Sequence, residues 1–101
     1  METTKRVWHQ GEEFKSVTEL KQKWPEVVFI CRDGENYSIY GKDAIKAAII
    51  FNTGYKESRH GEPEQVTFFE PELEVYLPKL VRAGHRVAII EPLEAGTSGR
   101  G

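Results

Sequence analysis

The sequence predicts one α+β domain, in which helices pack on a small mixed β-sheet. Three observations indicate this class: two β-prone runs around a tight-turn dipeptide, a later amphipathic helical pattern, and an apolar β-branched run after that helix. The chain has 101 residues, of which 39% are hydrophobic and 30% charged, and this suits a single hydrophobic core. We expect a folded domain at residues 14–94, between a flexible N-terminal arm (1–13) and a flexible Gly/Ser-rich tail (95–101).

The first predicted element is a short helix that begins at Ser16. Ser16 and Glu19 form an S-x-x-E capping box, in which each side chain binds a backbone amide of the other residue. Pro25 lacks the amide that would continue the helix, so we expect the helix to end near Trp24. The large indole of Trp24 predicts a core anchor, and stacking on a ligand is the alternative.

A β-hairpin at residues 27–40 follows, and it is the element on which we expect function to depend. An apolar, β-branched run precedes Asp33-Gly34, whose chemistry suits the two central positions of a type I′ turn. The run after the turn alternates polar with apolar residues. Since alternate residues of a strand share a face, Asn36 and Ser38 are predicted to form one polar patch beside the turn.

The second half of the chain predicts two more helices and two more strands. The apolar run at 44–51 indicates a buried helix, and residues 66–69 indicate a short strand after a polar surface loop. Pro71 begins a third helix, which Pro78 is expected to kink. Residues 87–90 are all apolar and predict a central strand covered on both faces. The third helix has an apolar stripe formed by Leu73, Tyr76, Leu77, Leu80 and Val81.

No catalytic, metal or cofactor site is predicted, and we do not expect an enzyme. His9, His60 and His85 are far apart in the sequence and are expected at the surface. Cys31 lies in the first strand of the hairpin, where a buried small hydrophobe is favoured over a reactive thiol. The sequence contains no signal-peptide run and no apolar run of membrane length, so we expect a soluble, cytoplasmic protein without a membrane partner.

Acidic residues are dense between residues 62 and 74, and the net charge of the chain is −2. These carboxylates indicate a solvated loop and helix start, with an acidic docking face for a basic partner as the alternative. Because the chain has no basic excess, nucleic-acid binding by the chain alone is expected to be weak. The carboxylates belong to Glu62, Glu64, Glu70, Glu72 and Glu74.

Two stretches carry a family resemblance. Residues 29–44 read FICRDGENYSIYGKDA, and residues 76–93 read YLPKLVRAGHRVAIIEPL. They resemble F-x-R-x-G-D-F-Y-E-L-F-x-x-D-A and Y-L-x-K-L-V-x-x-G-x-x-V-A-I-C-E-Q in the N-terminal domain (domain I) of the DNA mismatch-repair protein MutS. The resemblance covers residues 14–94 and implies a MutS domain I-like fold and a role on DNA within a DNA-processing assembly. The chain is then either a free-standing relative of that domain or part of a longer product.

The resemblance also implies a contact site on the hairpin. In the family, a Phe and a Glu, two residues apart on the second strand, enter the minor groove, where the Phe stacks on the mispaired base and the Glu hydrogen-bonds to it. Asn36 and Ser38 occupy these positions here, without a ring or a carboxylate. We therefore expect Asn36 and Ser38 to be the nucleic-acid contacts of a non-catalytic module that binds double-stranded DNA without mismatch specificity. The alternative is a protein-interaction module that keeps the fold and has lost DNA contact.

Overall fold

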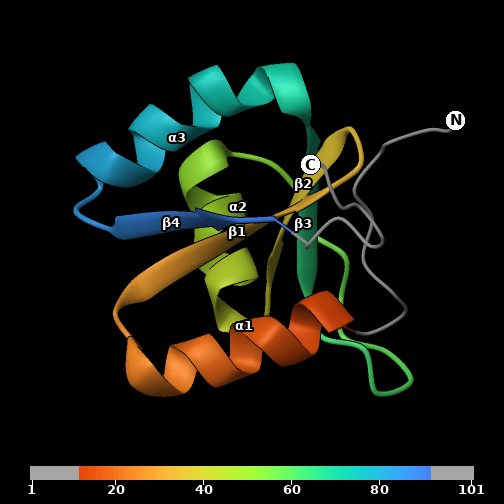
Figure 1. The fold of residues 1–101 in the computed structure, drawn as a ribbon. Helices are drawn as coiled ribbons and strands as arrows, with labels where there is room; N and C mark the ends of the chain where they lie inside the picture. The colour runs from red at the N-terminus through yellow and green to blue at the C-terminus, as the bar shows by residue number, and fades with distance from the viewer. Residues whose placement is uncertain (1–11, 92–101) are drawn as a thin grey trace, which may run out of the picture.

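The structure, a computed structural model, describes residues 12–91, which form a four-stranded sheet with helices on both faces (Figure 1). This arrangement confirms the predicted α+β class with a small mixed sheet. The tail and residues 1–11 of the expected arm lie outside the described residues. The elements follow in the order α1 (Glu12–Lys23), β1 (Val27–Asp33), β2 (Asn36–Tyr40), α2 (Lys42–Phe51), β3 (Gln65–Phe69), the 3-10 turn η1 (Glu70–Glu72), α3 (Leu73–Arg82) and β4 (Arg86–Ile90).

The strands lie in the order β3-β2-β1-β4, so the hairpin β1–β2 occupies the centre of the sheet. The pairs β1–β2 and β2–β3 are antiparallel, and β4 runs parallel to β1. The prediction of a central strand at residues 87–90 is therefore wrong, because β4 is an edge strand. The predicted cover on both faces is confirmed: Val87 packs into the core beneath α2 and α3, while Ala88 and Ile90 pack toward α1.

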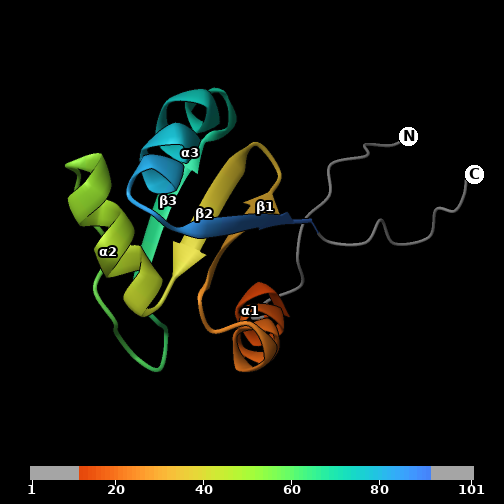
Figure 2. The ribbon, with the colours of Figure 1, turned by 90° about the vertical axis from the view of Figure 1, so that its left-hand side faces the viewer.

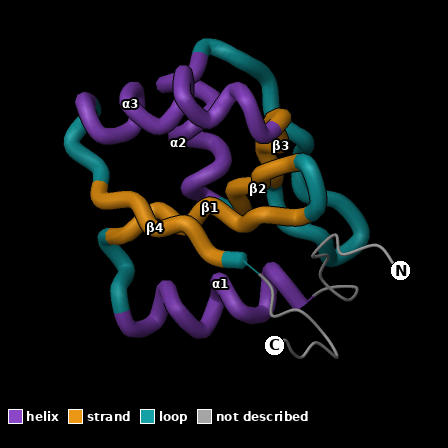
Figure 3. The backbone as a smooth tube through the Cα atoms, turned by 45° about the horizontal axis from the view of Figure 1, so that its top comes forward, coloured by secondary structure: helices purple, strands orange, loops and turns teal. Residues whose placement is uncertain are grey.

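Helices α2 and α3 cover one face of the sheet, and α1 covers the other (Figures 2 and 3). The larger core cluster lies between the sheet and α2 and α3, and its largest fully buried side chains are Ile30, Ile39 and Leu80. The smaller cluster lies under α1, where Val17 packs against side chains of β1 and β2. The period-2 alternation of the hairpin thus supplies both clusters, since its successive side chains point to opposite faces.

Helix α1 begins at Glu12, so the prediction of a helix start at Ser16 is wrong. The residues before Ser16 include two glutamates and a lysine, which are favourable helix formers. The prediction of Trp24 as a core anchor is also wrong, since its side chain is 47% exposed. The chain turns where α1 ends, with the Val27 N–H donating to the Trp24 carbonyl at 3.1 Å. Trp24 therefore lies at an exposed turn at the end of α1.

The hairpin turn differs by one residue from the prediction. Asp33 pairs with Asn36, so the central residues are Gly34 and Glu35, not Asp33 and Gly34. Gly34 has φ +65°, while Glu35 keeps a negative φ. A positive φ at the first central residue alone matches a type II′ turn, which requires glycine only there. Asp33 thereby extends β1 by one residue.

Helix α3 continues through Pro78 to Arg82 and follows the 3-10 turn η1, which contains Pro71. Leu80 is buried, and the other residues of the predicted stripe are half-buried except Val81. Val81 is exposed, so its inclusion in the stripe is wrong. Val81 follows Leu80 in the last turn of α3, and its side chain points to solvent and not to the core.

Lys21 fastens α1 to the rest of the domain. Its ammonium lies 2.9 Å from the Asp43 carboxylate and donates to the carbonyls of Pro25 and Val27, each at 2.8 Å. Replacing Lys21 by methionine is expected to lower the free energy of unfolding by about 1–3 kcal/mol, because the Asp43 carboxylate loses its charged partner. Urea denaturation measures this change. Lys46→Met, at an exposed position of α2, is the control, and an equal loss in both variants would contradict the assignment.

Candidate nucleic-acid interface

The turn end of the β1–β2 hairpin holds the residues that the sequence singles out. Tyr37 and Ile39 point into the core under α2 and α3, whereas Tyr40 packs with Val17 of α1 on the opposite face. Asn36 and Ser38 alternate with the core residues and therefore lie on the α1 side of the sheet. The predicted division of the second strand between two faces is confirmed.

Burial separates Asn36 from Ser38. Asn36 is exposed, whereas Ser38 is only 3% exposed. The Ser38 hydroxyl shares a hydrogen bond of 3.0 Å with the Thr67 hydroxyl and accepts another from Nε2 of Gln65, also at 3.0 Å. The predicted patch of Asn36 and Ser38 is therefore only partly at the surface, because side chains of β3 cover Ser38. The contact role of the two residues stays a prediction.

Strand β3 supplies residues that sequence reasoning missed. In the β2–β3 register, Phe69 pairs with Asn36 and Thr67 pairs with Ser38. Phe69 is 51% exposed, and Thr67 is exposed beside it. We call Asn36, Thr67 and Phe69 the hairpin-end surface. The alternation in QVTFF, whose valine and first phenylalanine are buried, indicates that Thr67 and Phe69 point outward. Their neighbours on β2 depend on the pairing register of β2 and β3, which the sequence does not reveal.

The backbone around Phe69 is held on both sides. The Phe69 N–H, on the outer edge of β3, donates to Oε1 of Glu72 at 2.8 Å. The carboxylate thus satisfies a backbone donor that has no partner strand. The N–H of the next residue, Glu70, donates to the carbonyl of Glu35 in the hairpin turn at 2.8 Å. The end of β3 is therefore fastened to η1 and to the turn, which fixes the direction in which the Phe69 ring leaves the sheet.

Several carboxylates lie at the turn end of the sheet. Arg32 of β1 lies on the α2 and α3 side, over the Tyr37 ring. Its guanidinium binds Oε2 of Glu70 at 3.0 Å, lies 3.9 Å from Oε2 of Glu91, and donates from Nε to the Gly34 carbonyl at 3.2 Å. Its charge is thus directed to acidic partners. We call the carboxylates at this end of the sheet the acidic rim. It consists of Asp33, Glu35, Glu70, Glu72 and Glu91.

The acidic stretch of the sequence is divided in space by β3. Glu70 and Glu72 belong to the acidic rim, whereas Glu62 lies in the loop before β3 and pairs with Lys56 at 3.2 Å. Both members of that pair are well exposed, so it contributes little to stability. As predicted, these carboxylates lie in a solvated loop and at a helix start, and the two groups are at opposite ends of one strand.

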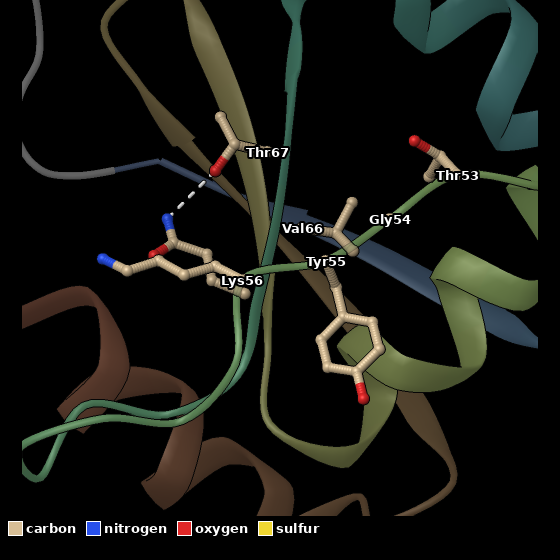
Figure 4. A pocket seen from close by; sticks show the side chains of 7 residues that line it. Thr53, Gly54, Tyr55, Lys56, Val66 and Thr67 are labelled. Carbon is tan, nitrogen blue, oxygen red and sulfur yellow. Dashed lines mark hydrogen bonds between the residues drawn. The ribbon is translucent and has the colours of Figure 1, made fainter.

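A shallow pocket of about 630 Å³ lies along the outer edge of β3 (Figure 4). Its lining includes Thr67, and the Gln65 amide donates to the Thr67 hydroxyl at 3.0 Å. Tyr55 extends its ring from the other side of the pocket toward α2. A second pocket of about 330 Å³ lies between α1 and the start of α2, next to the Lys21–Asp43 ion pair. Neither pocket brings a nucleophile together with a histidine base.

Other candidate chemical groups are dispersed. Cys31 is fully buried, which confirms the interpretation as a small hydrophobe. His60 lies in an exposed loop, His85 is half-buried between α3 and β4, and His9 lies outside the described residues. Over residues 12–91, no three His, Cys, Asp or Glu side chains gather where they could hold a metal ion. Within the same range, no helix has the length and apolar character needed to cross a membrane.

The comparisons with known proteins identify the family. The model of MutS domain I matches residues 13–100. The chain is 42% identical over 77 residues to the DNA mismatch repair protein MutS of Christiangramia forsetii, covering 74% of this chain and 9% of that protein. It is 41% identical over 83 residues to the MutS proteins of Phocaeicola vulgatus and Bacteroides fragilis, covering 79% of this chain and 10% of each. The chain therefore spans about a tenth of the length of these relatives, and it belongs to the MutS domain I family.

Proposed function

We propose that this chain is a non-catalytic module that contacts double-stranded DNA through the end of its hairpin and does not discriminate mismatches. Family membership supports a role on DNA. The observation that carries the proposal is Asn36, which is exposed at the position of the family's stacking residue and has no ring. Ser38, at the second position, has a hydroxyl that is already hydrogen-bonded and offers no carboxylate.

The electrostatics favour weak binding by the chain alone. The net charge is −2, and the acidic rim repels phosphates close to the hairpin-end surface. Protein–DNA affinity comes largely from the neutralisation of phosphates by lysine and arginine, and Arg32 is engaged by acidic side chains here. We therefore propose that the module works within a DNA-processing assembly, in which other components supply phosphate contacts.

A titration with labelled duplexes at low salt tests this proposal. The chain is expected to bind a matched duplex and a duplex with one G·T mismatch equally and weakly, and binding is expected to fall as salt increases. In Glu70→Gln, one rim charge is removed and Arg32 loses one of its acidic partners, so affinity is expected to rise about two- to five-fold. The control is Glu74→Gln on α3. Absence of salt-sensitive binding to either duplex at high micromolar protein would refute the proposal.

The acidic rim favours a second candidate, a protein-interaction module that keeps the fold without contacting DNA. Five carboxylates gathered at the turn end of the sheet suit a basic segment of a partner protein. A pull-down with the tagged chain, before and after nuclease treatment, separates the two functions. A partner that stays bound after nuclease treatment supports the protein-interaction module, and one that is lost with the nucleic acid supports the DNA-binding module.

A further inference from the structure

We propose that the outer edge of β4 pairs with β4 of a second copy of this chain, which joins two four-stranded sheets into one continuous sheet. The two strands run antiparallel around a twofold axis at Ala88. Strand β4 ends the sheet on the side away from β3 (Figure 2). Within residues 12–91, no strand pairs with its outer edge.

The composition of β4 is that of an interior strand. Residues 87–90 are all apolar and include no lysine or proline. Exposed edge strands of soluble proteins commonly carry such residues, or bulges, which prevent pairing with another chain. Strand β4 pairs with β1 in an unbroken register, without a bulge. No residue of β4 itself is buried, whereas four successive residues of β1 are. This apolar edge is therefore open to a further strand.

Ile89 shows which part of β4 lacks cover. It pairs with Ile30, which is fully buried in the larger core cluster, so both side chains lie on the face of α2 and α3. Ile89 is nevertheless 40% exposed. The helices on this face thus leave the outer part of β4 accessible, and a strand placed beside β4 would cover it.

The backbone of β4 directs alternate residues toward the open edge. Asp33 and Asn36 flank a two-residue turn, and such a closing pair exchanges its hydrogen bonds across the hairpin. By alternation, Ile30 then directs its N–H and C=O to β4, where it lies opposite Ile89. In a parallel pair, the residue opposite such a position directs its own N–H and C=O away from that partner strand. The outward-directed residues of β4 are Val87 and Ile89.

These outward residues fit a second copy of the same strand. When two β4 strands run antiparallel around Ala88, Val87 of each copy lies opposite Ile89 of the other. These two pairs exchange backbone hydrogen bonds, and Ala88 lies opposite its own copy in a pair without them. A twofold axis normal to the sheet keeps each face on its own side, so the valines and isoleucines meet on one face. One register therefore satisfies the edge and covers Ile89.

The charges at the two ends of β4 favour the antiparallel orientation. The acidic rim lies at the turn end of the sheet, where β4 leads to Glu91. Exposed arginines lie at the other end, Arg82 in the last turn of α3 and Arg86 at the start of β4. Antiparallel pairing brings these arginines toward the acidic rim of the second copy and places Glu91 opposite His85. A parallel pair would bring like charges together.

Sedimentation velocity of the complete chain between about 5 and 500 μM measures the association. A short strand pair buries little surface, so we expect a reversible dimer with a Kd of about 10–100 μM. Ile89→Lys places an ammonium among apolar side chains and should weaken the association about ten-fold or more. Ile49→Lys, at an exposed position of α2, should associate like the unchanged chain. A monomer at every concentration would overturn the inference.

Disulfide crosslinking with oxidised glutathione tests the register. Ala88→Cys places two thiols opposite each other, with Cα atoms about 4.5 Å apart, which a disulfide can bridge. A covalent dimer is expected to form. In the control Ile90→Cys, the two Cα atoms lie about 13 Å apart, which is too far. The unchanged chain gives the baseline, since its Cys31 is buried. Equal crosslinking of the two variants, or none in either, would overturn the inference.

Amide hydrogen exchange distinguishes a second copy from other occupants of the edge. The amides of Val87 and Ile89 should exchange fast in dilute solution and slowly at high concentration, whereas those of Ala88 and Ile90, directed to β1, should be slow in both. Slow exchange of all four amides in a monomer would show that something other than a second copy covers the edge, which would overturn the inference.

The dimer and the proposed function fail or succeed separately. Strand β4 runs parallel to β1, so antiparallel pairing of two β4 strands places the two hairpin turns at opposite ends of the joined sheet. Both hairpin-end surfaces stay free. Ile89→Lys is therefore expected to bind duplex DNA like the unchanged chain. Loss of DNA binding together with loss of the dimer would overturn this placement of the interface.

Discussion

Replacing Ile30 by alanine is expected to lower the free energy of unfolding by about 2–5 kcal/mol. Ile30 lies in β1 at the centre of the sheet, is fully buried, and belongs to the larger core cluster beneath α2 and α3. Its removal leaves a cavity between the sheet and the helices, which close packing prevents from collapsing completely. A domain of this size has a stability of about 5–15 kcal/mol, so the loss is a large fraction of the total.

Urea denaturation followed by circular dichroism measures this loss. Ile49→Ala is the matched control, because Ile49 is on α2 but 76% exposed. It is expected to change stability by less than about 0.5 kcal/mol. A similar loss in both variants would show that the packing of β1 against α2 and α3 does not determine stability.

Replacing Asn36 by phenylalanine is expected to create a preference for a G·T mismatch over the matched duplex of about five-fold or more. The new ring would stand at the family's stacking position, on an exposed strand residue that needs no rearrangement of the core. It would also stand beside Phe69, its partner across β2 and β3. Competition titration with matched and mismatched duplexes measures the preference. Equal binding of both duplexes would show that the surrounding acidic surface is also unsuited to mismatch recognition.

The companion variant Ser38→Glu should behave differently, although the family alignment treats the two positions alike. Ser38 is buried, and its hydroxyl is bonded to Thr67 and Gln65. A glutamate there loses these bonds and must either lose its hydration or displace the side chains of β3. Stability is expected to fall by about 1–3 kcal/mol without a gain in mismatch preference. A gain in preference at unchanged stability would show that Ser38 is accessible to DNA.

Local patterns predicted the elements of this fold well, because periodicity records which face of each strand or helix is buried. The hairpin and the division of its second strand between two faces follow from alternation. The apolar run at residues 44–51 predicted the helix α2, but α2 is buried on one side only, since Ile49 is 76% exposed. Predictions failed where the local sequence suited two kinds of structure almost equally. Asp33 suits both a turn and a strand, and only its pairing with Asn36 decides between them. Trp24 fits a buried helix face, but the helix ends before it.

The composition of the site depends on contacts that a local pattern does not contain. Phe69 and Thr67 join the hairpin only through the pairing of β3 with β2, across a long connection that includes α2. The burial of Ser38 has the same origin, since Gln65 and Thr67 cover it. Likewise, an apolar run such as β4 does not reveal whether it will be central or at an edge. The family resemblance located Asn36 correctly at the surface of the hairpin end, but it could not supply the neighbours of that residue.

The most direct test of the central claim, that the end of the hairpin contacts DNA, is an amide NMR spectrum of the isotope-labelled chain titrated with duplex DNA at low salt. We predict shift changes concentrated at Asn36 and Phe69 and at the turn between β1 and β2. Residues on the outer side of α2 and α3 should keep their shifts. An unchanged spectrum at saturating DNA, or changes confined to α2 and α3, would contradict the claim.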